Sequence, residues 1–251
     1  FVSRHCRWSL SLAELLKGDL AAGLARLDAL IADADSAHDM LREARIMTAL
    51  KPVYPYVPEV LATSQAGEVM DADFYVMARI SGIIPRQNLP KGLILSPEDT
   101  RQLCLNVIDK MIELHQVDYK QAGLDNMGKG EGYVKRQIDG WSDRFRKSHT
   151  PDVNDFEQVM AWLQAKMPAH DVATCLIHND FRFDNVVLDP ENSLKVIGVL
   201  DWEMATLGDP LMDLGTALGY WMEPSDPSMG VVQCFLTTEP GALTRYTCRF
   251  M

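Results

Sequence analysis

The sequence predicts an α+β protein with two lobes: a small N-terminal lobe that contains β-structure and a larger, mainly helical C-terminal lobe. Three observations support this class: leucine-rich segments with helical spacing, a β-rich run at 74–80 and a β-hairpin pattern at 186–200. A chain of 251 residues can form either one large domain or two small lobes. We place the boundary after residue 80, which gives an N-lobe at 1–80 and a C-lobe at 81–251.

Two helices and one strand are predicted in the N-lobe. Over residues 8–31, leucines recur every three or four positions, as on one face of a helix. A second helix is predicted from the capping-box pair Ser36 and Asp39 to a point before Pro52, with a single apolar stripe. Prolines then mark a connector, and the run FYVMARI at 74–80 predicts a strand that Gly82 and Pro85 terminate.

The C-lobe opens with a strong helix start at 96–99, because an N-cap serine, a proline and two acidic residues follow one another. This helix is expected to run to about Gln116 with one buried side. Further along the chain, two strands at 186–188 and 194–200 surround a turn at 189–192, which predicts a β-hairpin.

Composition limits the classes of partner. A formal net charge of −11 gives no long-range attraction to nucleic acid or to an anionic membrane. The basic cluster at 135–147 is interpreted as the charged face of an amphipathic helix, with an anionic-substrate site as the alternative. Five scattered cysteines argue against a disulfide framework and a zinc site, and no apolar run reaches the ~18 residues that span a bilayer. We therefore expect a cytoplasmic protein that binds neither nucleic acid nor membrane; its oligomeric state is not predicted.

Three polar clusters flank the strands of the predicted hairpin. His178-Asn179-Asp180 precedes the first strand, Asn185 opens it, and Asp201 closes the second strand. Because a hairpin returns the chain to its start, Asp180, Asn185 and Asp201 can converge. Two carboxylates and a carboxamide offer oxygen ligands, which suit Mg²⁺. Phosphoryl transfer needs such a set, with one carboxylate at the attacking hydroxyl and the other ligands on the metal.

The pattern His-x-Asp-x-x-x-x-Asn, followed by an Asp at a strand end, is that of the catalytic and metal-binding loops of kinase-fold enzymes. The segments LIHNDFRFDNVVLDP and VLDWEMATLGDPLMDLG resemble the aminoglycoside phosphotransferase and choline-kinase-like superfamily. They look most like the phosphotransferase-like domains of acyl-CoA dehydrogenase family members 10 and 11 and their stand-alone bacterial relatives. The resemblance covers roughly residues 36–245 and implies a protein-kinase-like, two-lobed fold that uses ATP and Mg²⁺.

The resemblance implies roles for individual residues. Asp180 would be the base that orients the acceptor hydroxyl, and His178 would brace its loop. Asn185 and Asp201 would hold the metal. Arg182 lies between the predicted base and the predicted metal ligand, where it would contact phosphate or brace the loop.

Contacts to the nucleotide are implied in the N-lobe. Glu43 aligns with the glutamate that normally pairs with a β-strand lysine at the ATP phosphates. Met77, Ala78 and Arg79 fall in the hinge whose backbone meets adenine.

Other residues of these segments are expected to be structural. Asp209 and Asp213 match family positions that fix loop backbone. Trp202 and Trp221 are interpreted as core aromatics, and His115 as a helix cap or a packing residue.

The sequence departs from the family pattern in two places. Asn179 stands where the family usually has Gly, which implies a different loop geometry there. Residues 1–35 do not resemble the glycine-rich hairpin and the lysine-bearing strand that should precede Glu43, and Lys17 is a poor substitute for that lysine. Those strands are either missing from this chain or altered, and the chain also ends before the further helices of family members.

Two functions remain open at this stage. The first is a kinase that moves the γ-phosphate of Mg-ATP to a hydroxyl of a small molecule. A hydroxyacyl-CoA-type metabolite is the acceptor that the resemblance implies, and an aminoglycoside-type antibiotic is the alternative. The second function is that of a pseudokinase or nucleotide-binding module, which the missing glycine-rich loop suggests. A protein kinase fits less well because Asp201-Trp202-Glu203 replaces Asp-Phe-Gly, and a serine hydrolase would need a G-x-S-x-G motif.

Overall fold

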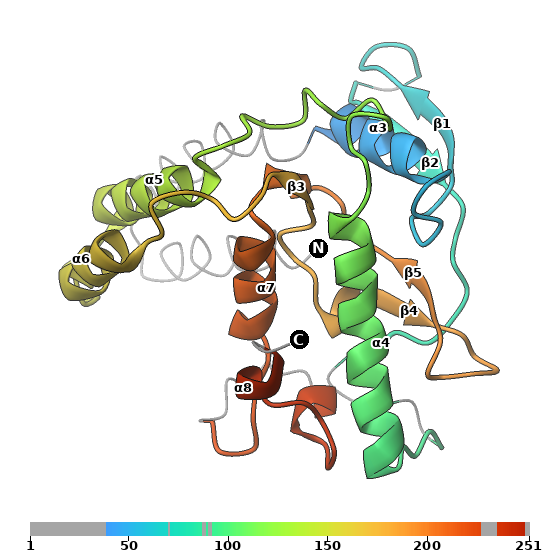
Figure 1. Cartoon of the computed structure of the whole chain (residues 1–251). Coiled ribbons are helices and arrows are strands. Elements are labelled where there is room, and N and C mark those ends of the chain that lie inside the picture. Colours follow the sequence, from blue (N-terminus) through green and yellow to red (C-terminus); the bar gives the residue numbers. More distant parts are fainter. Residues whose placement is uncertain (1–38, 70, 87–88, 90–91, 227–234, 249–251) are drawn as a thin grey trace, which may run out of the picture.

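The computed structural model describes residues 39–69, 71–86, 89, 92–226 and 235–248 (Figure 1). The predicted helix at 8–31 and the predicted cap Ser36 lie outside these residues. In the described part, helices surround three antiparallel sheets of two strands each. This is the α+β architecture that the sequence predicts. None of the described helices is both long and apolar enough to cross a membrane.

Helix α3 (Met40–Leu50) begins later than predicted. Asp39 is its N-cap and accepts a hydrogen bond from the backbone N–H of Arg42 at 2.8 Å, whereas the capping-box pattern placed Asp39 inside the helix. The helix ends before Pro52 as predicted, since proline has no N–H to continue the ladder. One side of α3 is buried at helical spacing, and it includes one charged residue: Glu43, Ala44, Ile46, Met47 and Leu50.

Strand β2 (Phe74–Met77) lies in the predicted run at 74–80 but ends three residues before Ile80. It pairs antiparallel with β1 (Val60–Ser64), a strand that the sequence analysis missed. Beyond β2 the chain crosses to the C-terminal part, where Ile83 and Leu188 exchange two backbone hydrogen bonds of 2.9 and 2.7 Å.

Helix α4 (Pro97–His115) forms the centre of the C-terminal part (Figure 1). Its predicted capping box is confirmed: Ser96 Oγ accepts the backbone N–H of Asp99 at 3.1 Å, and the Asp99 carboxylate accepts that of Ser96 at 3.3 Å. The helix ends at the C-cap Gln116, as predicted. Its buried side contributes a large share of the main core: Leu103, Cys104, Val107, Ile108, Met111 and Leu114.

Two nested strand pairs bring the polar motifs of residues 175–215 together. The predicted hairpin is confirmed as β4 (Val186–Leu188) with β5 (Val196–Val199), and β3 (Cys175–Ile177) pairs with β6 (Thr206–Gly208). A 3₁₀ turn, η1 (Phe183–Asn185), precedes β4. Since β3 pairs with β6 and β4 with β5, the loop from β3 to β4 must lie beside the loop from β5 to β6. Helix α7 (Pro210–Gly219) follows β6.

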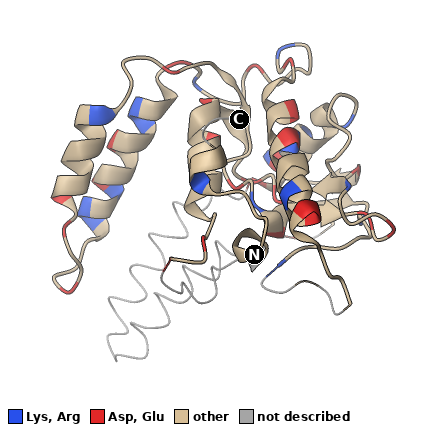
Figure 2. Ribbon diagram, turned by 60° about the horizontal axis from the view of Figure 1, so that its bottom comes forward, with Lys and Arg blue, Asp and Glu red and all other residues tan. Residues whose placement is uncertain are grey.

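Helices α5 (Tyr133–Ser148) and α6 (Glu157–Lys166) lie side by side, apart from the other helices that the structure describes (Figures 1 and 2). The amphipathic helix predicted around 135–147 is α5. Arg146 forms a two-point ion pair with Glu157 at 2.7 and 2.8 Å, and Gln164 donates to Asp139 at 2.6 Å. One basic residue of α5, Arg146, is therefore used in holding this helix pair together.

The remaining described elements are η3 (Phe235–Thr238) and α8 (Arg245–Cys248). Trp202 and Trp221 are 0% and 5% exposed within the main core, so both are core aromatics as predicted. The lobe boundary after residue 80 stays a prediction.

Candidate active site

The predicted base and the predicted metal-binding amide are bonded to each other. Asn185 Nδ2 donates to Asp180 Oδ2 at 2.9 Å and to the Asp180 backbone oxygen at 2.8 Å. The turn η1 makes this contact possible, because the Asn185 N–H donates to the Arg182 oxygen and folds the five-residue span back on itself. The structure thus brings Asp180 and Asn185 together, while their chemical roles remain predictions.

Asp201 joins this pair from the neighbouring loop. The N–H of Leu200 donates to the backbone oxygen of Asn185 at 2.8 Å, which places Asp201 next to it. Burial and the nearby carboxylates of Glu203 and Asp180 raise the pKa of Asp201. Its φ of +70° lies in the left-handed region, where Asp and Asn are found more often than most other non-glycine residues.

His178 is fully buried and holds the two loops in register. Its Nδ1 accepts the backbone N–H of Asp180 at 3.3 Å, so the proton of a neutral ring is on Nε2, which lies 3.0 Å from the Leu200 oxygen. The ring also packs edge-on against Phe181 and Trp202. These contacts fit the bracing role that the resemblance implies, and none of them leads to a reacting group.

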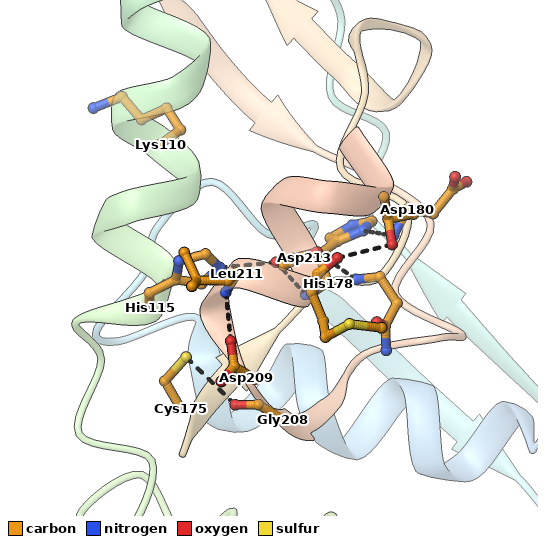
Figure 3. A network of polar contacts seen from close by, with 12 residues as sticks. Lys110, His115, Cys175, His178, Asp180, Gly208, Asp209, Leu211 and Asp213 are labelled. Atoms are coloured by element: carbon orange, nitrogen blue, oxygen red, sulfur yellow. Dashed lines mark hydrogen bonds and ion pairs between the residues drawn. The ribbon is translucent and has the colours of Figure 1, made fainter. Parts of the chain in front are cut away.

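Asp213 anchors the loop that carries His178 and Asp180 (Figure 3). Its carboxylate accepts the backbone N–H groups of His178 and Asn179 at 2.9 and 2.8 Å, and it lies 2.9 Å from His115 Nε2. Burial opposes the charge of Asp213, but the hydrogen bond and charge of His115 outweigh it and lower the pKa of this carboxyl. Asp213 fixes loop backbone as expected. His115, interpreted as a cap or packing residue, is instead its ion-pair partner from α4.

Asp209 plays a similar structural part at the start of α7. One carboxylate oxygen accepts the N–H of Leu211 at 2.7 Å and the other accepts that of Val172 at 2.6 Å (Figure 3). The carboxylate is therefore used as a helix cap and a loop anchor.

Arg182 is 9% exposed and lies against the predicted base. Its Nε is 3.4 Å from Asp180 Oδ1, one terminal nitrogen is 3.8 Å from Asp184, and the guanidinium stacks on the Tyr220 ring at 4.8 Å. The Nε atom has no hydrogen bond of normal geometry. Arg182 therefore balances the charge of Asp180 without being locked by it.

Helix α3 is fastened to the loop that carries Asp201. Glu43, 7% exposed, accepts the backbone N–H of Trp202 at 3.1 Å and a hydrogen bond from the Tyr75 side chain. Arg42 donates to the backbone oxygen of Glu203 at 3.2 Å and also to that of Ala205. Glu43 thus meets the backbone after the predicted metal ligand, while the sequence alignment implied a lysine partner.

The predicted hinge residues leave the first sheet at its edge. Met77 pairs with Val60, and the Ala78 N–H donates to the Glu59 oxygen at 2.7 Å. Met77 and Arg79 are exposed. Their predicted contact with adenine stays a prediction.

The side chains present fit a Mg²⁺ ion. Asn185 uses its Nδ2 on Asp180, so the amide oxygen is the end of the carboxamide that can face a cation. Asp201 lies among like charges that a cation would neutralise. No cluster of three or more His, Cys, Asp or Glu side chains gathers for a metal within the described ranges, and Mg²⁺ held by one carboxylate and one carboxamide does not require one, because it keeps water and phosphate ligands.

Several contacts at this site were not predicted. Arg42 and Tyr133 reach the loops through side chains that no motif marks, and Tyr133 OH donates to Asn179 Oδ1 at 3.0 Å. Tyr75 reaches Glu43 in the same way. Nothing in the spacing of these residues could have found them, since each contact joins distant parts of the chain.

Comparison with known proteins places this site in a family. The sequence matches the model of the phosphotransferase enzyme family over residues 18–237. Acyl-CoA dehydrogenase family member 11 of Rattus norvegicus is 35% identical over 178 residues, which are 71% of this chain and 22% of that protein. Family member 10 of Mus musculus is 35% identical over 193 residues, 76% of this chain and 18% of that protein. The chain spans about a fifth of the length of these relatives.

Solved structures agree on the fold. A Ralstonia eutropha protein provisionally named an aminoglycoside phosphotransferase superposes with a TM-score of 0.72 at 29% identity, covering 84% of this chain and 63% of that one. An aminoglycoside phosphotransferase in complex with GDP and kanamycin superposes with a TM-score of 0.59 at 16% identity, covering 85% of this chain and 70% of that one. Another, in complex with AMP-PNP and hygromycin B, superposes with a TM-score of 0.52 at 18% identity, covering 71% of this chain and 60% of that one. The last two show the shared kinase-like fold alone. With its matched family model, its relatives and its loops, this chain belongs to the phosphotransferase enzyme family.

Proposed function

We propose that the protein transfers the γ-phosphate of Mg-ATP to a hydroxyl group of a small molecule. The observation that carries this proposal is the bonded pair Asp180 and Asn185, with Asp201 held beside it on the neighbouring loop. One carboxylate next to a carboxamide and a second carboxylate is the arrangement that in-line phosphoryl transfer needs.

Asp180 acts on the acceptor in this proposal. Its carboxylate accepts a hydrogen bond from the acceptor hydroxyl and takes the proton as the new oxygen–phosphorus bond forms. The bond between the γ-phosphorus and the bridging oxygen breaks, and ADP leaves with that oxygen. Asn185 keeps the Asp180 carboxylate in one orientation, and His178 keeps the Asp180 backbone in place.

Asn185 and Asp201 would hold Mg²⁺. When bound, the ion would supply positive charge that neutralises the negative charge developing on the phosphate groups. Arg182, whose Nε lies 3.4 Å from Asp180, balances the negative charge on the acceptor side.

The nucleotide assignment rests on the hinge and on solved relatives. The hinge would offer backbone groups of Met77, Ala78 and Arg79 to adenine. It begins at the last residue of β2, the strand whose Tyr75 is hydrogen-bonded to Glu43. Solved relatives were crystallised with AMP-PNP and with GDP, which supports nucleotide binding and leaves the base preference to experiment.

For the acceptor we propose a hydroxyacyl-CoA-type metabolite. The support is that acyl-CoA dehydrogenase family members share 35% identity with the chain, whereas the antibiotic enzymes above share 16% and 18%. An aminoglycoside is the alternative acceptor. A cytoplasmic location belongs to the same proposal, and the free thiols of Cys104, Cys175 and Cys248 support it.

An acceptor screen tests this function. The chain is incubated with Mg-ATP and, separately, with hydroxyacyl-CoA thioesters, kanamycin and hygromycin B, and phosphorylated product is followed by phosphorus NMR. We expect product with the thioesters and at least a ~100-fold loss of rate in Asp180→Asn, because general-base catalysis contributes about that much. Product with an antibiotic alone would overturn the acceptor class. Absence of product with every acceptor would overturn the kinase.

The second candidate is a module that binds nucleotide without turnover. This candidate is motivated by Glu43, which aligns with the family glutamate that pairs with a lysine at the ATP phosphates. In this chain the Glu43 carboxylate accepts hydrogen bonds from the Trp202 N–H and the Tyr75 side chain. It predicts Mg-ATP binding without product in the same screen.

A further inference from the structure

Asn179, which stands where the family usually has glycine, has a backbone conformation that glycine adopts readily. Its φ is +66°, in the left-handed region that favours glycine, and asparagine tolerates that region better than most side chains. The different loop geometry that the sequence implied at this position stays a prediction. What distinguishes this chain is the added carboxamide, which sits one residue before Asp180.

The carboxamide uses both of its ends. Oδ1 accepts the hydroxyl of Tyr133 at 3.0 Å, and Nδ2 donates to the backbone oxygen of Met204 at 3.0 Å. These two bonds also fix which end of the amide is oxygen, because only one orientation satisfies both. Asn179 thereby joins three segments: the loop of Asp180, the first turn of α5 and the loop that follows Asp201.

The contact on α5 is rigid. The backbone N–H groups of Tyr133 and Val134 donate to the carboxylate of Asp171 at 2.7 and 3.1 Å, which caps a helix whose N-cap, Gly132, has no side chain. The Tyr133 side chain is 7% exposed and packs so closely on Gly208 that a Cβ there would lie 3.0 Å from the ring. Its hydroxyl is therefore a fixed point.

The loop after Asp201, whose Met204 oxygen accepts from Asn179, is also bound by α3. Arg42 of α3 binds the backbone oxygens of Glu203 and Ala205, the two neighbours of Met204. The three consecutive carbonyl groups at 203–205 are thus shared between α3 and Asn179. Movement of this loop relative to Asp180 would have to break bonds on one side or the other.

We infer that Asn179 is a positioning residue, whose carboxamide sets the separation between Asp180 and the Asp201 loop with Tyr133 as its anchor. The inference rests on the proposed phosphotransferase function. A shift of the base relative to the metal-binding loop misaligns the reacting groups, so the side chain acts on the chemical step and not on the affinity for nucleotide.

Two variants separate this role from a role in stability. Asn179→Gly keeps the positive φ and removes both side-chain bonds, and Tyr133→Phe removes only the bond to Oδ1. We expect kcat to fall on the order of 10-fold in Asn179→Gly and about 3-fold in Tyr133→Phe, as the loss of one or two ordinary hydrogen bonds allows. KM for Mg-ATP should stay unchanged. Tyr119→Phe, on the segment after α4, is the matched control and should keep the full rate.

A double-mutant cycle makes the test specific. In Asn179→Gly the Tyr133 hydroxyl has lost its acceptor, so adding Tyr133→Phe should change kcat no further. Additive losses, or a kcat in Asn179→Gly equal to that of the unaltered chain, would overturn the inference and leave the proposed function standing. A chain that transfers no phosphate to any acceptor would overturn the proposed function itself, and the inference with it.

Discussion

The carboxylate of Glu43 on α3 accepts the backbone N–H of Trp202, the residue after Asp201, at 3.1 Å. The two residues are 159 positions apart in the sequence. This bond fixes the backbone of the predicted metal-binding loop to the N-terminal helix. A change in α3 would therefore be transmitted to Asp201 without any contact between their side chains.

Substitution of Glu43 tests whether the hydrogen bond or the charge matters at this position. Burial raises the pKa of Glu43, so the site favours a neutral acceptor. Glu43→Gln should be as stable as the unaltered chain at pH 7, because the amide oxygen can still accept from Trp202. Glu43→Ala should lose about 1–3 kcal/mol, since it leaves a buried N–H without a partner.

Urea unfolding of both variants measures this difference. Equal stability of Glu43→Gln and Glu43→Ala would show that the bond to Trp202 contributes nothing.

The lowered pKa of Asp213 leads us to expect that the stability of the chain depends on pH. Its folded pKa is lowered below the usual 3.8, so its contribution is fully present above that pH and is lost as the pH falls through the folded value. Asp213→Asn should lower the free energy of unfolding by about 3–5 kcal/mol at pH 7, because it breaks the buried pair with His115. The new amide group would also point an N–H donor at a position where the carboxylate accepts hydrogen bonds. That cost should shrink below pH 3.8.

Asp139→Asn is the matched control for this prediction, since Asp139 forms an exposed ion pair with Lys135 on α5. It should change stability far less than Asp213→Asn does, because exposed ion pairs contribute little. A loss in Asp213→Asn no larger than in the control, measured by unfolding at pH 7, would contradict the anchoring role of Asp213.

A side chain at position 82 should cause a steric clash, because the segment after β2 passes close to the β4–β5 hairpin there. A Cβ at Gly82 would lie 2.4 Å from the backbone oxygen of Leu188, so Gly82→Ala should push the two segments apart and cost about 1–3 kcal/mol. Gly140, inside α5, has open space around it, and Gly140→Ala should stabilise by roughly 0.5–1 kcal/mol because alanine favours a helix. Thermal unfolding of the two variants should therefore shift in opposite directions. A shift of the same sign in both would refute the close approach.

The sequence predicts those parts of this fold that depend on local signals. The capping box at Ser96 marks the start of α4, and turn residues at 189–192 mark the hairpin that returns the chain from Asn185 to the loop of Asp201. Strand β3 and strand β6 have three residues each, too few for an alternating pattern, and residues 178–205, which include the hairpin, separate them in the chain. That pairing was therefore missed.

The partners of the site residues were beyond local reasoning for the same reason. His115 reads as a helix-terminal residue in the sequence, and its ion pair with Asp213 exists only because α4 packs beside the catalytic loop. Asn179 appears as a departure from a family pattern, and only the structure shows its bonds to Tyr133 and Met204. Motif spacing identifies which residues meet along the hairpin, whereas tertiary packing decides what surrounds them.

The most direct test of the central claim is thermal unfolding with and without ATP and with and without Mg²⁺, on the unaltered chain and on Asp201→Asn. Asparagine tolerates the positive φ of this position, so the variant removes a charge with little change of backbone. Asp143→Asn, an exposed carboxylate on α5, serves as the control. A ligand at ~100 times its Kd should stabilise the chain by ~2.7 kcal/mol. We predict a Mg²⁺-dependent stabilisation that Asp143→Asn keeps and Asp201→Asn loses. No stabilisation of the unaltered chain, or an equal one in Asp201→Asn, would contradict a nucleotide site built on Asp201.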